Sequence, residues 1–166
     1  MKTSRFRYWK LAFAGLLAGS LIAGRAIPVR AGLGGDDSSV ESDAAALKGK
    51  MSELSAKELA QSDSYSIRTF VSANGISVRE YVARAGPIFG IAWEGCRPPD
   101  LSVLLGSYYA EYVWAAGLKQ HINLHRDVIE GSHAIVSLRG RMGRLIGRAY
   151  VPTLAPLGVD ANAVVK

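Results

Sequence analysis

Residues 65–93 alternate between apolar and polar side chains with a period of two, which is typical of β-strands that bury one face. Asn74-Gly75 divides this region, because the dipeptide favours a tight hairpin turn in which both residues have a positive φ. A second turn around Ala85-Gly86 divides it again. Both turns place the same apolar side chains on one face, so the pattern predicts a three-stranded antiparallel meander. This face carries Ile67, Val71, Val78, Val82, Phe89, Ile91 and Trp93.

The two turns also predict how the strands pair. A two-residue turn at Asn74-Gly75 would pair Val71 with Val78, Thr69 with Glu80 and Ile67 with Val82, leaving Phe70 opposite Arg79 and Arg68 opposite Tyr81. The second turn would pair Val82 with Phe89, Glu80 with Ile91 and Val78 with Trp93.

Helical spacing replaces this alternation on either side of the meander. Ser38 and Glu41 have the spacing of a capping box. Gly49 is a place where this first helix is expected to break or bend, since glycine costs about 1 kcal/mol relative to alanine. Pro99 suits the first position of a second helix, over residues 99–117. The apolar stripe of the first helix is Val40, Ala44, Leu47, Met51 and Leu54.

The order of these elements predicts the fold class. Residues 118–131 show no clear pattern, and two further strands follow at about 133–138 and 142–151. Helix, three strands, helix and two strands predict an α+β domain with a five-stranded, mainly antiparallel sheet and helices on one face. This single domain covers residues 38–152, after a flexible lead-in at 32–37 and before a C-terminal tail at 153–166.

Residues 1–31 have the organisation of a secretory signal peptide. Their first ten residues carry four basic and no acidic side chains, and the next 14, up to Gly24, carry no charge. This apolar run is shorter than the roughly 20 residues of a membrane span. The residues just before Gly32 are of the kinds that signal peptidases accept, so we predict cleavage between Ala31 and Gly32. The protein would then contact the membrane only transiently, through this segment. An uncleaved membrane anchor is the alternative.

Removing this segment changes the charge of the protein. The chain has 20 basic and 14 acidic residues, a net charge of +6. Six of the basic residues and none of the acidic ones lie in residues 1–31, which leaves 14 of each in the processed chain. Nucleic-acid binding needs a basic excess that displaces counterions, so we predict no nucleic-acid partner.

Glu80 is a candidate functional carboxylate. The predicted pairing puts it on the apolar face, where an unpaired carboxylate is costly. It would either line a pocket with a raised pKa or form a structural pair with an arginine or a helix amide.

A second candidate is an arginine–aromatic surface on the opposite face of the sheet. Such a surface can hold a carboxylate-bearing or sugar ligand through bidentate hydrogen bonds and stacking. The alternative is a solvated sheet face with exposed cation–π pairs. Its predicted members are Arg68, Phe70, Arg79, Tyr81, Arg144, Arg148 and Tyr150.

The remaining chemistry-bearing residues give weaker patterns. His121 and His125 would share one face of a helix, but no glutamate follows His121 as a metalloprotease motif requires. Cys96 is the only cysteine, which excludes an internal disulfide. No nucleophile elbow, phosphate loop or dinucleotide fingerprint is present in the sequence, so we predict no cofactor and no metal.

Several short segments resemble an uncharacterised family of small exported bacterial proteins, classed as a domain of unknown function. Cys96 departs from the family pattern, in which a proline is expected after the preceding glycine. The resemblance implies an exported protein and transfers no catalytic residue. The segments that carry it are 32–35, 79–82, Ile88–Gly95, Pro99–Leu101, Leu104–Tyr108 and Gly147–Pro152, with Ala-Trp-Glu-Gly and Gly-Arg-Ala-Tyr the most specific.

These observations lead to two expectations of function. The first is a non-enzymatic binding or accessory module in the bacterial periplasm or outside the cell, whose partner is a protein or a small-molecule ligand of the envelope. The second is a small hydrolase or metal-dependent enzyme that uses Glu80 or the pair His121 and His125.

Overall fold

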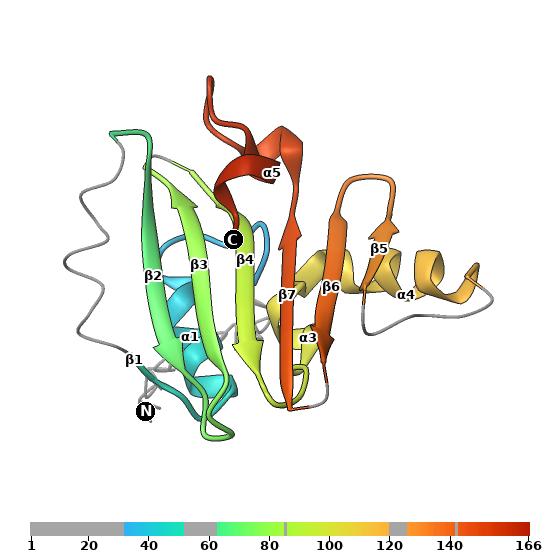
Figure 1. The fold of residues 1–166 in the computed structure, drawn as a ribbon. Helices are drawn as coiled ribbons and strands as arrows, with labels where there is room; N and C mark the ends of the chain where they lie inside the picture. Colours follow the sequence, from blue (N-terminus) through green and yellow to red (C-terminus); the bar gives the residue numbers. More distant parts are fainter. Residues whose placement is uncertain (1–31, 52–62, 85, 120–125, 142) are drawn as a thin grey trace, which may run out of the picture.

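The computed structural model describes residues 32–51, 63–84, 86–119, 126–141 and 143–166, and arranges them around one antiparallel sheet (Figure 1). The strands are β1 (Lys50–Met51), β2 (Tyr65–Val71), β3 (Ser77–Ala83), β4 (Ile88–Gly95), β5 (Arg126–Glu130), β6 (Ile135–Arg141) and β7 (Arg144–Tyr150). The helices are α1 (Ser39–Ala46), α3 (Leu101–Leu104), η1 (Gly106–Tyr108), α4 (Tyr109–Gly117), η2 (Pro152–Leu154) and α5 (Ala161–Val164).

The sheet has the strand order β1-β2-β3-β4-β7-β6-β5, and every neighbouring pair is antiparallel. The meander β2–β3–β4 and the hairpin β6–β7 lie where the sequence predicts them, and β4 joins β7. The α+β class and the antiparallel sheet are therefore confirmed. The predicted count of five strands is wrong, because β1 and β5 extend the sheet at its two edges.

Neither β1 nor β5 shows an alternation of apolar and polar residues, for a physical reason. β1 has only two residues, too few to show a period, and Met51 continues the spacing of the predicted helical stripe. β5 is an edge strand with only Ile129 buried, so it carries no apolar face. Edge strands of this kind are recognised by the partner that they pair with rather than by their own pattern.

The predicted pairing of β2 with β3 is wrong by one residue. Val71 pairs with Ser77 and Phe70 with Val78. The Ser72 amide donates to the Ile76 carbonyl at 2.9 Å, which closes a loop of three residues rather than two. In this loop Gly75 has a φ of +73° and Asn74 does not have a positive φ, as in a turn that ends in a bulge. The extra residue turns Phe70 into the core and Val71 out to solvent.

The second hairpin follows its predicted pairing for most of its length. Val78 pairs with Trp93 and Glu80 with Ile91, as the sequence predicts. A register shift after Tyr81 then pairs Val82 with Ile88, so its predicted pairing with Phe89 is wrong. An extra residue in a strand bends it and redirects a side chain. Here it moves Phe89 to the other face of the sheet, beside Tyr81.

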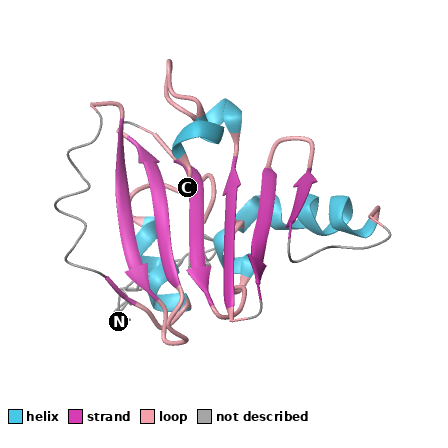
Figure 2. Cartoon of the chain, in the orientation of Figure 1, coloured by secondary structure: helices cyan, strands magenta, loops and turns pink. Residues whose placement is uncertain are grey.

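Each face of the sheet carries a buried core. Helices α1, α3 and α4 cover the first face, which we call the helix face; its core includes Phe70, Val78 and Trp93. Helix α5 and the residues around it cover one end of the other face, which we call the outer face, against Tyr81 and Phe89. Figure 1 and Figure 2 show α5 beside η2 and in front of the strands, away from α1, α3 and α4, which lie behind them. The prediction of helices on one face is thus correct for α1, α3 and α4 and wrong for α5.

The helices are shorter than predicted. Helix α1 ends at Ala46, and the chain then turns through Lys48, with a φ of +50°, and Gly49. Ser38 makes no side-chain cap; instead the Asp36 carboxylate accepts from the Ser39 amide at 3.0 Å. The predicted helix at 99–117 is divided into α3, η1 and α4 at Gly106, whose φ is +50°.

Residues 32–35, expected as a flexible lead-in, are hydrogen-bonded into the fold. The Leu33 amide donates to the Leu104 carbonyl and the Gly34 amide to the Ile88 carbonyl, both at 2.8 Å. Leu33 is only 2% exposed and belongs to the core of the helix face. At the other end of the chain, residues 153–166 are packed on the outer face through Ala161 and Val165. Residues 32–166 thus contain every described element and both cores.

Candidate functional site

The residues predicted to form one arginine–aromatic surface lie on both faces of the sheet. Phe70 is fully buried in the core of the helix face. Arg68 is on the same face, and its guanidinium binds both Asp37 carboxylate oxygens at 2.7 and 2.9 Å. The register shift in the first hairpin causes this separation, because it exchanges the two faces of β2. The outer face keeps Arg79, Tyr81, Arg144, Arg148 and Tyr150.

Three of these outer-face residues hold the C-terminal segment of the chain. The Arg148 guanidinium donates to the main-chain carbonyls of Asn162 and Val165 at 2.8 and 3.0 Å, and to the Asn162 side-chain oxygen at 2.9 Å. The Tyr150 hydroxyl also donates to that oxygen, at 3.2 Å. The Tyr81 hydroxyl donates to the Lys166 carbonyl at 3.1 Å. These side chains therefore have a structural role in covering the outer face.

Burial raises the pKa of Tyr150 above its ordinary value, although the nearby Arg148 guanidinium acts in the opposite direction. Asp160 and Glu130 raise it further. Its hydroxyl is thus held in the protonated form, which is the form that donates to Asn162.

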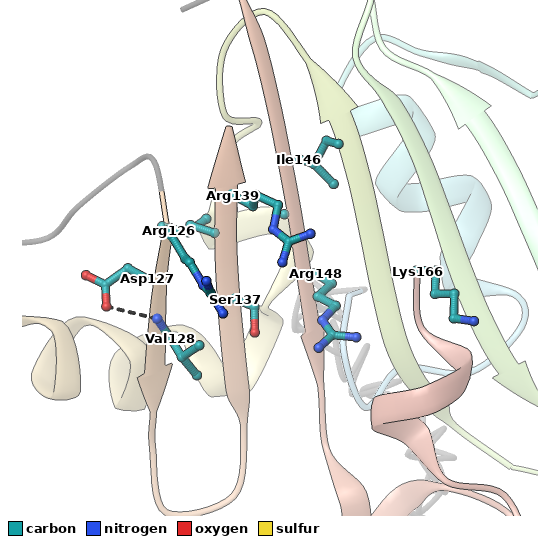
Figure 3. A pocket seen from close by; sticks show the side chains of 10 residues that line it. Arg126, Asp127, Val128, Ser137, Arg139, Ile146, Arg148 and Lys166 are labelled. Atoms are coloured by element: carbon teal, nitrogen blue, oxygen red, sulfur yellow. Dashed lines mark hydrogen bonds between the residues drawn. The ribbon is translucent and has the colours of Figure 1, made fainter. Parts of the chain in front are cut away.

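Beside this segment, the outer face has a hollow of about 500 Å³ over β5, β6 and β7, which we call the arginine hollow. Figure 3 shows the side chains of Arg126, Arg139 and Arg148 on this side of the sheet, one from each strand. Ser137 and Ile146, the cross-strand partners of Arg148 and Arg139, also line the hollow. The hollow therefore combines cationic groups, a hydroxyl group and an apolar surface.

Arg126 and Arg139 are direct cross-strand partners, and both are exposed. Like charges opposite each other in an antiparallel pair destabilise it. Among the residues that the structure describes, no carboxylate forms an ion pair with either guanidinium. Asp127 lines the hollow but forms an ion pair with Lys119, and its side chain points away from the arginines (Figure 3). The pair is thus positioned to receive an anion from solution.

The sequence pattern offers little indication of this pair. Arg126 lies in the segment without a clear pattern, and Arg139 lies between the two strands predicted at about 133–138 and 142–151. The two become neighbours only through the pairing of β5 with β6. Arg144, in contrast, binds the Glu94 carboxylate at 2.7 Å, outside the hollow.

Glu80 is fully buried on the helix face of β3, next to Asp43 of α1, which is 1% exposed. Burial raises the pKa of Asp43 to about 7, although hydrogen bonds from Glu80 and from the Gly32 backbone lower it. Burial and then the charge of Asp43 raise the pKa of Glu80 well above its usual range. Two carboxylates cannot donate to each other, so the pair holds a proton.

This carboxyl pair is separate from the described hollows. Neither Glu80 nor Asp43 lines the arginine hollow or a second hollow of about 80 Å³ beside Trp93 and Tyr112. The sequence identified Glu80 from its place among apolar residues. It missed Asp43, because an acidic residue in the second turn of a short helix is ordinarily exposed.

The histidines and the cysteine form no metal site among the residues described. His121 and His125 lie outside those residues. The third histidine, His133, has its ring nitrogen Nδ1 3.1 Å from the Glu111 carboxylate. Cys96 is exposed and unpaired. No group of three or more His, Cys, Asp or Glu residues in the described part of the chain could hold a metal ion.

Glu111 of α4 has a structural role. It accepts hydrogen bonds from the backbone amides of His133 and Ala134. Burial opposes its charge, but these amides and the His133 ring hold the pKa of Glu111 below its usual value. The carboxylate thus attaches α4 to the loop between β5 and β6.

The fold and the site define a small α+β protein with one antiparallel sheet and a cationic hollow on its outer face. The chain belongs to the family described as "Protein of unknown function (DUF2844)", whose sequence model matches residues 29–164. The resemblance to a domain of unknown function is therefore confirmed. No curated protein and no solved structure matches the chain. Within the described residues, no helix has the length and apolarity to cross a membrane.

Proposed function

We propose that this protein is exported and works as a non-enzymatic binding module in the bacterial periplasm or outside the cell, with a carboxylate-bearing ligand in the arginine hollow. One observation carries the ligand assignment. Arg126 and Arg139 face each other across two strands without a described acidic partner. A bound carboxylate would convert this repulsion into two charge-assisted interactions.

Export is supported by the organisation of residues 1–31 and by the place of the predicted cleavage. Cleavage after Ala31 would fall directly before Gly32, one residue ahead of Leu33, which is buried in the core. A segment removed there takes none of the described core residues with it.

A carboxylate suits the hollow better than a neutral ligand. Guanidinium groups bind carboxylates in a planar, bidentate geometry, and Ser137 adds a hydroxyl that donates or accepts. Ile146 offers an apolar surface for the body of the ligand. An acidic sugar of the cell envelope combines these features. Because the processed chain has balanced charge, the electrostatic attraction for such a ligand comes from the arginines of the hollow and not from the net charge of the protein.

A binding experiment tests the ligand class. Glucuronate and glucose are titrated into the ¹⁵N-labelled processed protein, and amide shifts are followed by NMR. We expect saturable shifts at residues of β5, β6 and β7 with glucuronate and none with glucose. Arg126→Ala and Arg139→Ala should each weaken binding at least tenfold. Arg97→Ala, an exposed arginine outside the hollow, is the matched control. Equal shifts with both sugars, or unchanged affinity in both hollow variants, would contradict the proposal.

Export has its own test. Protein purified from the envelope fraction of an expressing bacterium should begin at Gly32 by mass spectrometry. An intact Met1 would show that the segment is retained. Proteins that co-purify with the tagged processed chain would identify a macromolecular partner.

We assign no catalytic role to Glu80. It is enclosed together with Asp43 and lines neither described hollow. A carboxylate that acts on a substrate has to reach it.

A further inference from the structure

The buried carboxyl pair of Asp43 and Glu80 has few hydrogen-bond donors. Apart from a proton shared between the two carboxyl groups, no described residue donates a hydrogen bond to either Glu80 oxygen or to Asp43 Oδ2. Both side chains are at most 1% exposed. A buried carboxyl group without donors costs free energy, so this arrangement calls for a cationic partner.

The nearest candidate cation by pairing is already occupied. Arg68 is the cross-strand partner of Glu80, on the same face of the sheet. Its guanidinium nevertheless binds the Asp37 carboxylate through two hydrogen bonds, and Asp37 precedes α1. Arg68 therefore neutralises the charge of Asp37 and does not neutralise the buried carboxyl pair.

The backbone nitrogen of Gly32 is at the pair. It donates a hydrogen bond to Asp43. Gly32 is itself buried and has a φ of +101°. A Cβ atom there would lie only 2.5–2.6 Å from the carbonyl oxygens of Val103 and Leu104, so only glycine fits. Hydrogen bonds of Leu33 and Gly34 with the core then hold this nitrogen in place.

The predicted cleavage falls on the bond of this same nitrogen. We propose that export processing turns Gly32 into the N-terminal residue and that its ammonium group forms a buried ion pair with Asp43 and Glu80. In the cleavage, a signal peptidase adds water across the Ala31–Gly32 bond. The hydroxyl goes to the Ala31 carbonyl carbon, and the nitrogen keeps its own hydrogen and takes the second hydrogen of the water, which gives an amine. At neutral pH this amine binds one more proton and becomes an ammonium, while the new carboxyl group of Ala31 gives up a proton. The leader leaves with a carboxylate.

The chemistry of the two groups is complementary. An intact peptide bond offers one N–H, which Asp43 already accepts. An ammonium offers three donors and a positive charge, which can serve the carboxyl oxygens that otherwise lack a donor. The unperturbed pKa of an α-amino group is about 8, so it is charged at neutral pH, and the carboxylates favour that form.

This inference rests on the proposed export, but its experiment does not. Two forms of the chain, beginning at Gly32 or at Ala31, are made by removing a ubiquitin fused directly ahead of that residue. Each form is prepared with and without Glu80→Gln, and unfolding in urea is measured at pH 7. Glu41→Gln, on the exposed side of α1, is the matched control.

The two forms should respond differently to Glu80→Gln. In the chain that begins at Gly32, Glu80→Gln should lower the folding equilibrium constant at least tenfold, which is about 1.4 kcal/mol, because a buried ammonium loses its partner. In the chain that begins at Ala31, the same substitution should leave the constant unchanged or raise it. Equal effects of Glu80→Gln in both forms would overturn the ion pair. Glu41→Gln should have no effect in either form.

A second measurement needs no variant. An acylating reagent at neutral pH should label the N-terminal amine of the folded chain at least tenfold more slowly when the chain begins at Gly32 than when it begins at Ala31. Equal rates would also overturn the proposal. If the exported protein starts at another residue, the export proposal fails, while the ion pair is still decided by these two forms.

Discussion

At the scale of single residues, Asp43 and Glu80 make the stability of this protein depend on pH. A carboxyl group whose pKa is raised by folding stabilises the folded state below its unfolded pKa and loses that contribution as the pH rises through its folded pKa. For Asp43 this window extends from about 3.8 to about 7, and Glu80 extends it upward. Arg68, the cross-strand partner of Glu80, forms an ion pair with Asp37.

We therefore expect the chain that begins at Ala31 to lose stability as the pH rises from 4 to 7, because the unfolded chain releases its carboxyl protons over this range while the folded chain retains them. Urea unfolding across this range measures the slope. Asp43→Asn should flatten the slope, and Glu41→Gln should leave it unchanged. A stability that rises from pH 4 to pH 7 would contradict the assignment of the raised pKa values.

Gly147 illustrates how a single position depends on packing. A Cβ atom at this residue of β7 would collide with the Trp93 ring on the neighbouring strand. Gly147→Ala should destabilise the protein by about 1–3 kcal/mol, the usual cost of overpacking. Gly117→Ala meets no atom within 4 Å and lies at the end of α4, so it should be neutral or slightly stabilising. Urea denaturation followed by tryptophan fluorescence compares the two; equal effects would contradict the predicted contact.

At the scale of elements, the strands of the meander were predictable because their alternation and turn residues are local properties of the chain. The pairing of β2 with β3 was not predictable, because Asn74-Gly75 fits both a two-residue and a three-residue turn. Packing decides between them: Phe70 is larger than Val71, and the observed register buries it. The bulge that redirects Phe89 toward Tyr81 likewise depends on contacts across the sheet.

Helix α4 and the β5–β6 loop are connected by one side chain. Glu111→Ala removes the acceptor of the His133 and Ala134 amides and should cost about 1–2 kcal/mol. Hydrogen exchange of these two amides should accelerate, which NMR measures. Because folding lowers the pKa of Glu111, its contribution is present above the ordinary value of 4.5 and is lost as the pH falls through the folded value.

The control for this prediction is Glu41→Ala, which removes an exposed glutamate from the first turn of α1. It should leave exchange at His133 and Ala134 unchanged. If Glu111→Ala also leaves these amides as protected as before, the loop is held by other contacts than this carboxylate.

At the scale of the whole molecule, one sheet connects the two cores. The helix-face core and the outer-face core use alternate residues of the same strands, such as Val82 and Tyr81 of β3. Loss of either core exposes the other, so we expect residues 32–166 to unfold in one cooperative transition. Urea transitions followed by circular dichroism and by tryptophan fluorescence should coincide; separate midpoints would contradict this coupling.

The candidate site was only partly predictable for a related reason. The sequence indicated an arginine-rich outer face, and Arg148 is both on that face and in the hollow. Arg126 and Arg139, which line the hollow with it, come from an edge strand without a pattern and from the segment between the two predicted strands. Which arginines meet is a property of strand order, and strand order is not encoded in any single segment.

The sequence by itself determined the α+β class, the meander, the signal-peptide pattern and the unusual position of Glu80, because period, turn residues and charge are local. Only the tertiary structure decided the register, the two edge strands and the neighbours of the buried carboxyl group. These features depend on contacts between distant segments, where the burial of one side chain competes with that of the next. The meeting of Gly32, Asp43 and Glu80 is such a contact, between the segment before α1, α1 itself and β3.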